Sequence, residues 1–271
     1  MTRGAILFAF NTEKFNYYEM AEYTARRITH FLGLPVTIVT DEDSYPEQPD
    51  YVWDKVIKVV PDKNNTRVWG TWINKGRWQA YDLTPYDETL LIDVDYVVNS
   101  SKLSKLFDMY DDFICHNTID FLMQPNAEQE KISYYGYNSL WATVIAFKKT
   151  DTAKRVFECM QMVQNNYEYY MNLHSFNTGI YRNDYALTIA MDIVNGHLTT
   201  KSDFIPWNLI HIGSNTQIYK TNDDELDTEF TVTFDNWQRG KVRKEYLTIK
   251  DMDFHVMDKE LFVEIINATD V

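Results

Sequence analysis

The chain has 271 residues, of which 45% are hydrophobic and 24% are charged, and its formal net charge is −14. These proportions indicate a folded protein with a sizeable core, and they exclude fibrous and intrinsically disordered chains. The acidic balance excludes a protein that coats nucleic acid nonspecifically, because neutralising phosphates requires a basic surface. No apolar run reaches the roughly 20 residues that cross a bilayer, so we expect a soluble, cytoplasmic protein without a membrane span.

Cysteine and aromatic usage narrow the class further. Cys115 and Cys159 form no Cys-x-x-Cys pair, which predicts two buried thiols rather than a disulfide framework or a zinc site. Aromatic residues make up 15% of the chain, which suggests rings that stack on sugars or bases in addition to core packing.

The first 40 residues alternate between strand and helix patterns. Residues 5–10 form an apolar run that ends in a polar loop, as expected of a strand buried on both faces. Residues 17–32 carry the apolar stripe of a helix, which Gly33 ends. Residues 36–40 then predict a second strand.

The alternation continues with strands at 55–60 and 89–92 and a short helix at 74–83 between them. It predicts a doubly wound, mostly parallel sheet over the first 115 residues, with ligands at the carboxyl ends of the strands. Further along the chain we expect a strand at 139–147, helices at 151–171 and 183–194, and strand pairs within 230–257 around a turn at 239–240.

An acidic pair follows the strand that ends at Ile92. Asp93 and Asp95 flank Val94, and residues two apart in an extended segment point to the same side. The two carboxylates can therefore converge on one hard cation while Val94 faces the core, with water and a diphosphate completing the coordination. The sequence predicts a divalent metal site here, with a solvated acidic turn as the alternative.

These residues carry a resemblance to a known family. The first 115 positions resemble the GT-A glycosyltransferases, above all glycosyltransferase family 8, through residues 77–83, the turn at Pro85 and residues 87–98. The resemblance implies a single GT-A (nucleotide-diphospho-sugar transferase) domain over residues 1–271. This is an α/β fold whose mostly parallel sheet has helices on both faces, with a β-rich C-terminal embellishment.

The same resemblance divides the domain into two halves. Residues 1–115 would bind the nucleotide sugar, and residues 116–271 would form the acceptor half, which carries the C-terminal metal-ligand segment. Arg77 matches the family's arginine before the Asp-x-Asp motif and would contact the donor diphosphate or sugar, with Lys75 as a weaker candidate. A surface arginine is the alternative for Arg77.

The resemblance also implies a third metal ligand near the C-terminus. Residues 253–259 resemble the family's histidine segment, in which His255 would join Asp93 and Asp95 around Mn²⁺ (or Mg²⁺), and Lys259 would bind the donor phosphates. The family's glycine and its Lys-Pro-Trp ending are missing from this segment. We expect the metal site to be exposed.

Residues 176–187 resemble the acidic family segment that hydrogen-bonds donor-sugar hydroxyls. The resemblance gives Asp184, together with Arg77, the catalytic role, and places Asn183 among the donor contacts. A helix N-cap is the alternative for Asp184. In the GT-A fold the base and ribose of the donor nucleotide lie where the first two strands end. The resemblance therefore implies donor contacts from Phe10, Asn11, Thr12 and Asp41. The alternative is that these residues form ordinary loops without a ligand.

Together these residues predict a metal-dependent glycosyltransferase that moves a hexosyl or pentosyl group from a nucleoside-diphosphate donor, a UDP-sugar, to an acceptor hydroxyl. The family mechanism implies retention of the anomeric configuration. The alternative is a catalytically silent nucleotide-sugar binding protein. A sugar nucleotidylyltransferase is not favoured, because residues 11–14 do not form its glycine-rich loop.

The acceptor stays open at this stage. The chain also resembles compact glycosyltransferases of tailed phages, some of which modify hydroxymethylpyrimidines in DNA. A basic run near the predicted turn consists of Arg239, Lys241, Arg243 and Lys244. The phage resemblance implies that this run contacts DNA phosphates, and a solvated hairpin tip is the alternative. A saccharide, a lipid-linked sugar or a protein remains an equal alternative as acceptor.

Overall fold

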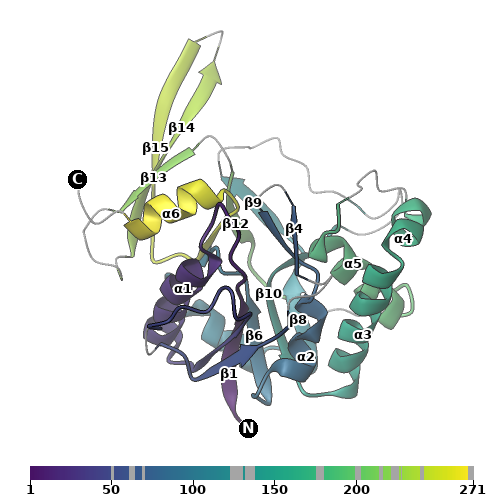
Figure 1. The fold of residues 1–271 in the computed structure, drawn as a ribbon. Coiled ribbons are helices and arrows are strands. Elements are labelled where there is room, and N and C mark those ends of the chain that lie inside the picture. The colour runs from purple at the N-terminus through teal and green to yellow at the C-terminus, as the bar shows by residue number, and fades with distance from the viewer. Residues whose placement is uncertain are drawn as a thin grey trace.

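The computed structural model describes residues 1–49, 52–60, 65–68, 71–122, 131, 138–174, 180–198, 203–213, 216–220, 226, 228–238 and 241–267. A seven-stranded sheet forms its centre (Figure 1), in the order β11 (Asp203–Phe204), β8 (Phe113–His116), β10 (Trp141–Lys148), β6 (Glu88–Ile92), β1 (Arg3–Phe8), β2 (Val36–Thr40) and β3 (Lys55–Lys58). Strands β6, β1, β2 and β3 run parallel, and β10 is antiparallel to β6 and β8. The predicted mostly parallel sheet is confirmed.

Helices cover both faces of this sheet, as expected. Side chains alternate along β1, so Ala5 and Leu7 pack in one core cluster while Ile6 and Phe8 pack in another. The first cluster lies under α1 (Tyr17–Leu32), whose C-cap Gly33 has a left-handed φ of 65°. The opposite face is covered by α2 (Ala80–Leu83), α3 (Asp151–Asn165) and α5 (Asn183–Val194), with α4 (Tyr167–Leu173) beside them.

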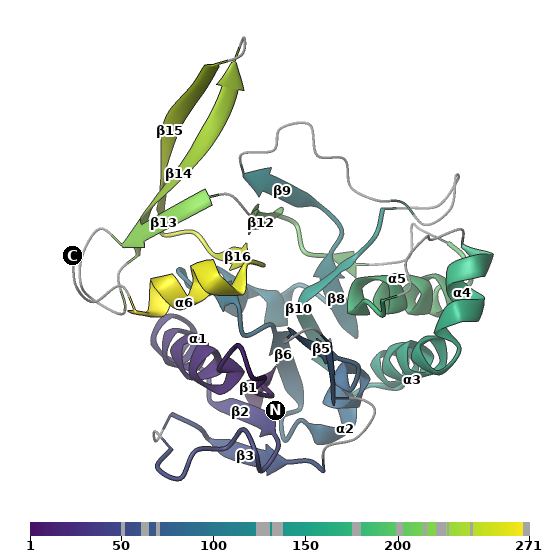
Figure 2. The same cartoon turned by 45° about the horizontal axis from the view of Figure 1, so that its top comes forward.

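A second sheet stands at the carboxyl ends of the parallel strands. Its order is β7 (Tyr96–Val97), β16 (Phe254–Val256), β12 (Leu209–Ile212) and β9 (Ile119–Leu122). Helix α6 (Lys259–Asn267) follows β16 and lies beside α1 (Figure 2). The sequence predicted only β16 of this sheet, and the pairing brings the C-terminal segment against residues 96 and 97.

The β-rich embellishment is a long hairpin that projects from the body (Figures 1 and 2). Strand β14 (Glu229–Gln238) pairs with β15 (Lys241–Lys250), and β13 (Thr216–Lys220) joins the edge of β14. Phe230, Val232 and Ile249 are buried at its base. A shorter hairpin consists of β4 (Asn65–Val68) and β5 (Thr71–Asn74).

Two predicted helices have different bounds. The helix expected at 74–83 starts at Arg77 as a 3₁₀ turn that leads into α2, because residues 71–74 pair with β4 instead. The helix expected at 151–171 is interrupted at Asn166, whose backbone φ of −124° leaves the helical region between α3 and α4.

The structure tests the expectations about the cysteines and about a membrane span. Cys115 is buried and Cys159 is half-buried, and both are free thiols. Every helix in the described ranges is too short or too polar to span a lipid bilayer. The cytoplasmic location stays a prediction.

One glycine on β1 supports a stability prediction. A Cβ atom at Gly4 would lie 2.4 Å from the ring of Tyr86. That ring is held in place because its hydroxyl accepts from Thr37 at 2.9 Å and donates to Asp54 at 3.1 Å. We expect Gly4→Ala to lower the free energy of unfolding by about 1–3 kcal/mol, as overpacking does, measured by urea denaturation.

A double variant checks the cause of this loss. In a Tyr86→Leu background, which vacates the ring's volume, Gly4→Ala should cost less than it does in the wild-type chain. Strictly additive costs would show that the ring contact is not the reason.

Candidate functional site

The Asp-x-Asp segment forms a tight turn at the carboxyl end of β6. The amide of Asp93 donates to the carbonyl of Thr143 at 2.9 Å, and the amide of Tyr96 donates back to the carbonyl of Asp93 at 3.2 Å. The expected extended segment is therefore wrong, since the turn itself brings the two carboxylates together. Val94 is buried in the core, as predicted.

His255 completes a cluster with the two carboxylates. Ligand atoms of Asp93, Asp95 and His255 all lie within 4.8 Å of one another. Strand β16 carries His255 to this point because it pairs with β7, which directly follows the acidic turn. Two carboxylate oxygens and one imidazole nitrogen suit a divalent cation such as Mn²⁺, so the residues fit the predicted metal.

The cluster is more buried than expected. Asp95 and His255 are each 5% exposed, because β16 lies inside the second sheet, whereas the side chain of Asp93 is 34% exposed. The expectation of an exposed site is therefore wrong for two of the three ligands. Access to the cluster is from the side of Asp93.

Lys259 begins α6 and forms an ion pair with Asp95. Its Nζ also donates to the carbonyl of Met257 at 3.0 Å. Burial alone would lower the pKa of Lys259, but Asp95 raises it. Burial alone would raise the pKa of Asp95, but Lys259 and His255 hold it well below its usual range. Both groups therefore stay charged at neutral pH.

Arg77 lies behind the cluster and is 1% exposed, so the surface-arginine alternative is wrong. Its guanidinium donates to the carboxylate of Asp93 and to the carbonyl of Ala142 on β10. These contacts hold the carboxylate of Asp93 against the end of the sheet. Lys75 lies half-buried in the turn before it. Donor contact by either residue stays a prediction.

Helix α5 starts beside the cluster. Because Asn183 is its first residue and Arg182 occupies the cap position, the N-cap alternative for Asp184 is wrong. The carboxylate of Asp184 accepts from the amide of Ala142 at 2.9 Å and from Arg182 at 3.1 Å. The amide nitrogen of Asn183 donates to the carbonyl of Asn74 at 2.8 Å. Residues 176–179 of the predicted segment lie outside the described residues.

The residues expected to bind the nucleoside lie in two adjoining loops. The amide of Asn11 donates to the hydroxyl of Ser44 at 2.7 Å, and the amide of Ser44 donates to the buried carboxylate of Asp41 at 2.9 Å. Phe10 is buried, and the hydroxyl of Thr12 accepts from the backbone of its own loop. These contacts join the ends of β1 and β2, and donor contact stays a prediction.

A pocket of about 240 Å³ opens beside the cluster, lined by Phe8, Tyr17, Asn74, Asp93, Val94, Asp95, Tyr181, Asn183 and Lys259. The lining contains four of the predicted site residues, from the turn after β6, from α5 and from α6. Sequence reasoning missed Tyr17, Asn74 and Tyr181. Tyr17 and Asn74 each begin a predicted helix, and Tyr181 lies within the predicted segment 176–187. Nothing in the sequence distinguishes these three residues from their neighbours, so only the fold reveals their place in the pocket.

Sequence reasoning also missed a histidine behind His255. His211 on β12 lies with its Nδ1 3.0 Å from Nδ1 of His255. Burial and, to a smaller extent, the nearby His255 lower the pKa of His211 to about 3, so its ring is neutral. The apolar run around His211 indicates a strand, but nothing in the sequence indicates which strand lies beside it.

This chain is similar to known proteins in its fold and not in its sequence. Neither a family model nor a curated protein sequence matches the chain. The solved structure of the galactosyltransferase LgtC in complex with donor and acceptor sugar analogs matches over 99% of this chain and 97% of that chain, with 12% identity and a TM-score of 0.55. The chain therefore has the GT-A fold of glycosyltransferases, as predicted.

Two further matches are weaker. An active-site mutant of LgtC matches over 68% of this chain and 70% of that chain, with 14% identity and a TM-score of 0.48. The glycosyltransferase GlyE of Streptococcus pneumoniae TIGR4 matches over 76% of this chain, with 12% identity and a TM-score of 0.43. The match covers 46% of the GlyE chain, so this chain spans about half its length.

Proposed function

We propose that this protein is a metal-dependent glycosyltransferase whose donor is a nucleoside-diphosphate sugar, with UDP as the nucleotide. The observation that carries the proposal is the pocket beside Asp93, Asp95 and His255, with the charged Lys259 in its wall. A divalent cation and an ammonium group at one end of a pocket suit a diphosphate, which needs positive charge on several oxygens. The family resemblance adds uracil as the base.

Each residue has a distinct part in this proposal. Asp93, Asp95 and His255 hold the cation, which when bound supplies positive charge that stabilises the diphosphate as it leaves. Arg77 keeps the carboxylate of Asp93 in place, and Lys259 offers its ammonium to the phosphates. Water is limited at the cluster because Asp95 and His255 are buried.

The sugar itself would lie further along the pocket wall. Asn183 lines the pocket there, and Asp184 follows it on α5. The resemblance gives this pair the donor-sugar contacts. Retention of the anomeric configuration follows from the same resemblance.

A screen of nucleotide sugars by thermal shift tests the donor. With Mn²⁺ present, UDP-sugars should raise the melting temperature, whereas CMP-sugars, which lack a diphosphate, should not. EDTA should remove the effect of the UDP-sugars. No stabilisation by any nucleoside-diphosphate sugar in the presence of Mn²⁺ would contradict the proposal.

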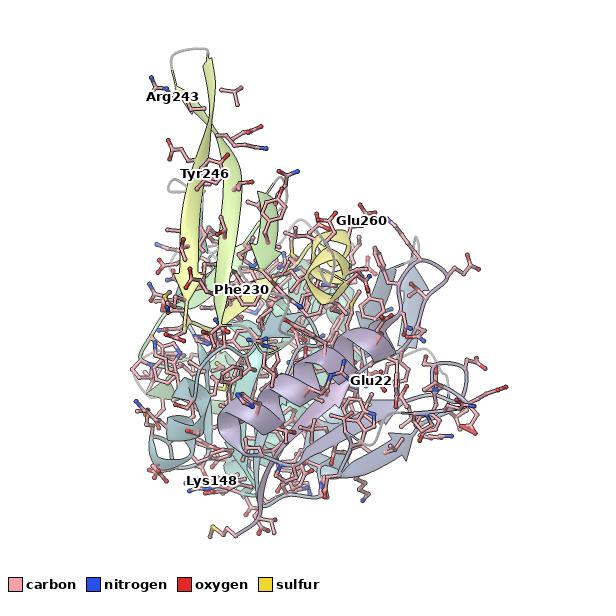
Figure 3. The ribbon with its side chains drawn as sticks, turned by 90° about the vertical axis from the view of Figure 1, so that its left-hand side faces the viewer. Glu22, Lys148, Phe230, Arg243, Tyr246 and Glu260 are labelled. Atoms are coloured by element: carbon pink, nitrogen blue, oxygen red, sulfur yellow. The ribbon has the colours of Figure 1, made fainter. Side chains whose placement is uncertain are left out.

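For the acceptor we propose a hydroxymethylpyrimidine in DNA, supported by the projecting hairpin. Figure 3 shows Arg243 near the tip of this hairpin and Tyr246 about midway along it. Arg243 and Lys244 are exposed, and Tyr246 is 69% exposed, in a chain whose overall charge repels a polyanion. Arg239, Gly240 and the side chain of Lys241 lie outside the described residues.

The salt dependence of DNA binding tests this acceptor. Changing Arg243 and Lys244 to alanine should flatten the slope of log K against log salt for a hydroxymethylpyrimidine duplex by roughly one unit per lost phosphate contact. Lys250→Ala is the matched control at the base of the hairpin, because its ammonium is paired with Glu229 at 3.2 Å. Transfer to a saccharide but not to modified DNA would contradict this acceptor and leave the proposed reaction intact.

A further inference from the structure

A second histidine supports His255 from the side that faces away from Asp95. Strands β12 and β16 pair in parallel with His211 directly opposite His255, and the two Nδ1 atoms lie 3.0 Å apart. His211 is 3% exposed and His255 is 5% exposed. The contact is therefore fixed by the register of two strands rather than by flexible surface side chains.

The hydrogen between the two rings determines which nitrogen of His255 can bind a cation. Two Nδ1 atoms at this distance share one hydrogen, so one ring donates and the other accepts. Nε2 of His255 lies 3.2 Å from the carboxylate of Asp95, on the side of the metal cluster. A neutral imidazole that binds a cation through Nε2 carries its hydrogen on Nδ1. His211 must then accept that hydrogen through its own Nδ1.

Aromatic rings restrict the rotation of both imidazoles. The ring of Phe121 packs edge-on against His211 with centroids 5.3 Å apart, and Trp141 lies 5.6 Å from His211. Trp141 also lies 6.4 Å from His255. Because these rings come from β9 and β10, the pair of histidines is enclosed by strands of both sheets.

We propose that His211 is a positioning residue of the metal site: it accepts the Nδ1 hydrogen of His255 and so fixes the tautomer and the ring orientation in which Nε2 binds a divalent cation. Partners of this kind typically contribute 10–100-fold to metal affinity. The proposal rests on the metal dependence proposed above. It adds a residue that the family resemblance did not supply.

Mn²⁺ binding to the full chain tests the proposal, measured from the EPR signal of free Mn²⁺. His211→Phe keeps an aromatic ring between Phe121 and Trp141 but offers no acceptor, and we expect the dissociation constant for Mn²⁺ to rise about 10–100-fold. His211→Asn places an acceptor oxygen near the position of Nδ1, so it should restore most of the affinity. Urea unfolding without metal reports the stability of each variant separately.

Phe121→Leu is the matched control, because it loosens the ring packing around His211 and leaves the hydrogen bond in place. It should bind Mn²⁺ within about threefold of the wild-type chain, a difference below 1 kcal/mol. Wild-type affinity for Mn²⁺ in a folded His211→Phe variant would overturn the role of His211 and leave the proposed metal dependence intact. The same conclusion would follow if His211→Asn or Phe121→Leu lost as much affinity as His211→Phe. A wild-type chain that does not bind Mn²⁺ would overturn both this role and the proposed metal dependence.

Discussion

Asp95→Asn should abolish the joint stabilisation of the protein by Mn²⁺ and UDP. In the wild-type chain the two together should raise the melting temperature by more than the sum of their separate effects, because the diphosphate adds ligands to a cation that the protein only partly surrounds. At 100 times the dissociation constant, binding contributes about 2.7 kcal/mol, which corresponds to roughly 5–10 °C for a chain of this size. The variant keeps the shape of the side chain and loses its charge.

Glu88→Gln provides the matched control for this experiment. Glu88 is a buried carboxylate at the start of β6, the strand that ends just before the turn of Asp93 and Asp95. It pairs with Arg3 at 2.5 Å and with Lys148 at 3.5 Å. Its loss should lower the melting temperature and leave the joint effect of Mn²⁺ and UDP unchanged. A joint effect that survives in Asp95→Asn would remove Asp95 from the metal site.

Arg77→Leu should have the largest effect on stability. The substitution removes the guanidinium that pairs with the carboxylate of Asp93 and donates to the carbonyl of Ala142. Arg77 is 1% exposed, so this loss falls in a buried region. Breaking an ion pair whose arginine is buried, together with leaving the carbonyl of Ala142 without a donor, costs about 3–5 kcal/mol. Calorimetry should show a melting temperature lower by roughly 6–20 °C. Affinity for Mn²⁺ should fall as well, because Asp93 is no longer held in place.

Arg3→Leu is the comparison for Arg77. The side chain of Arg3 is 41% exposed, so water replaces part of its ion pair with Glu88. Its loss should cost about 1 kcal/mol or less, although Glu88 becomes unpaired on one side. Equal losses in the two variants would contradict a structural role for Arg77 at the site.

The central sheet could be predicted from the sequence because its signals are local. The apolar runs at residues 5–10, 36–40 and 89–92 predict buried strands without reference to any partner. The second sheet could not be predicted in the same way, because β16 pairs with β7 across more than 150 residues of chain. Pairing at such a distance depends on the whole fold rather than on a pattern within either strand.

The site shows the same division. Asp93, Asp95, His255 and Lys259 were predicted because they belong to motifs, and the structure brings them together. His211 was not predicted, because its importance lies in one contact with a neighbouring strand. The burial of the cluster was also missed, since an acidic turn after a strand usually faces solvent, whereas here β16 covers it.

Release of sugar from a UDP-sugar, followed by chromatography, tests the proposed reaction most directly. Water carries a hydroxyl group that can take the place of the acceptor hydroxyl, so the assay needs no knowledge of the acceptor. With a donor identified by thermal shift, we expect release of UDP and free sugar in Mn²⁺, none in EDTA, and a loss of at least about 100-fold in Asp95→Asn, since misplacement or loss of one catalytic contact costs this much. Donor binding without any release, in the presence of Mn²⁺ and a panel of DNA and saccharide acceptors, would contradict the proposed transferase and indicate a nucleotide-sugar binding protein.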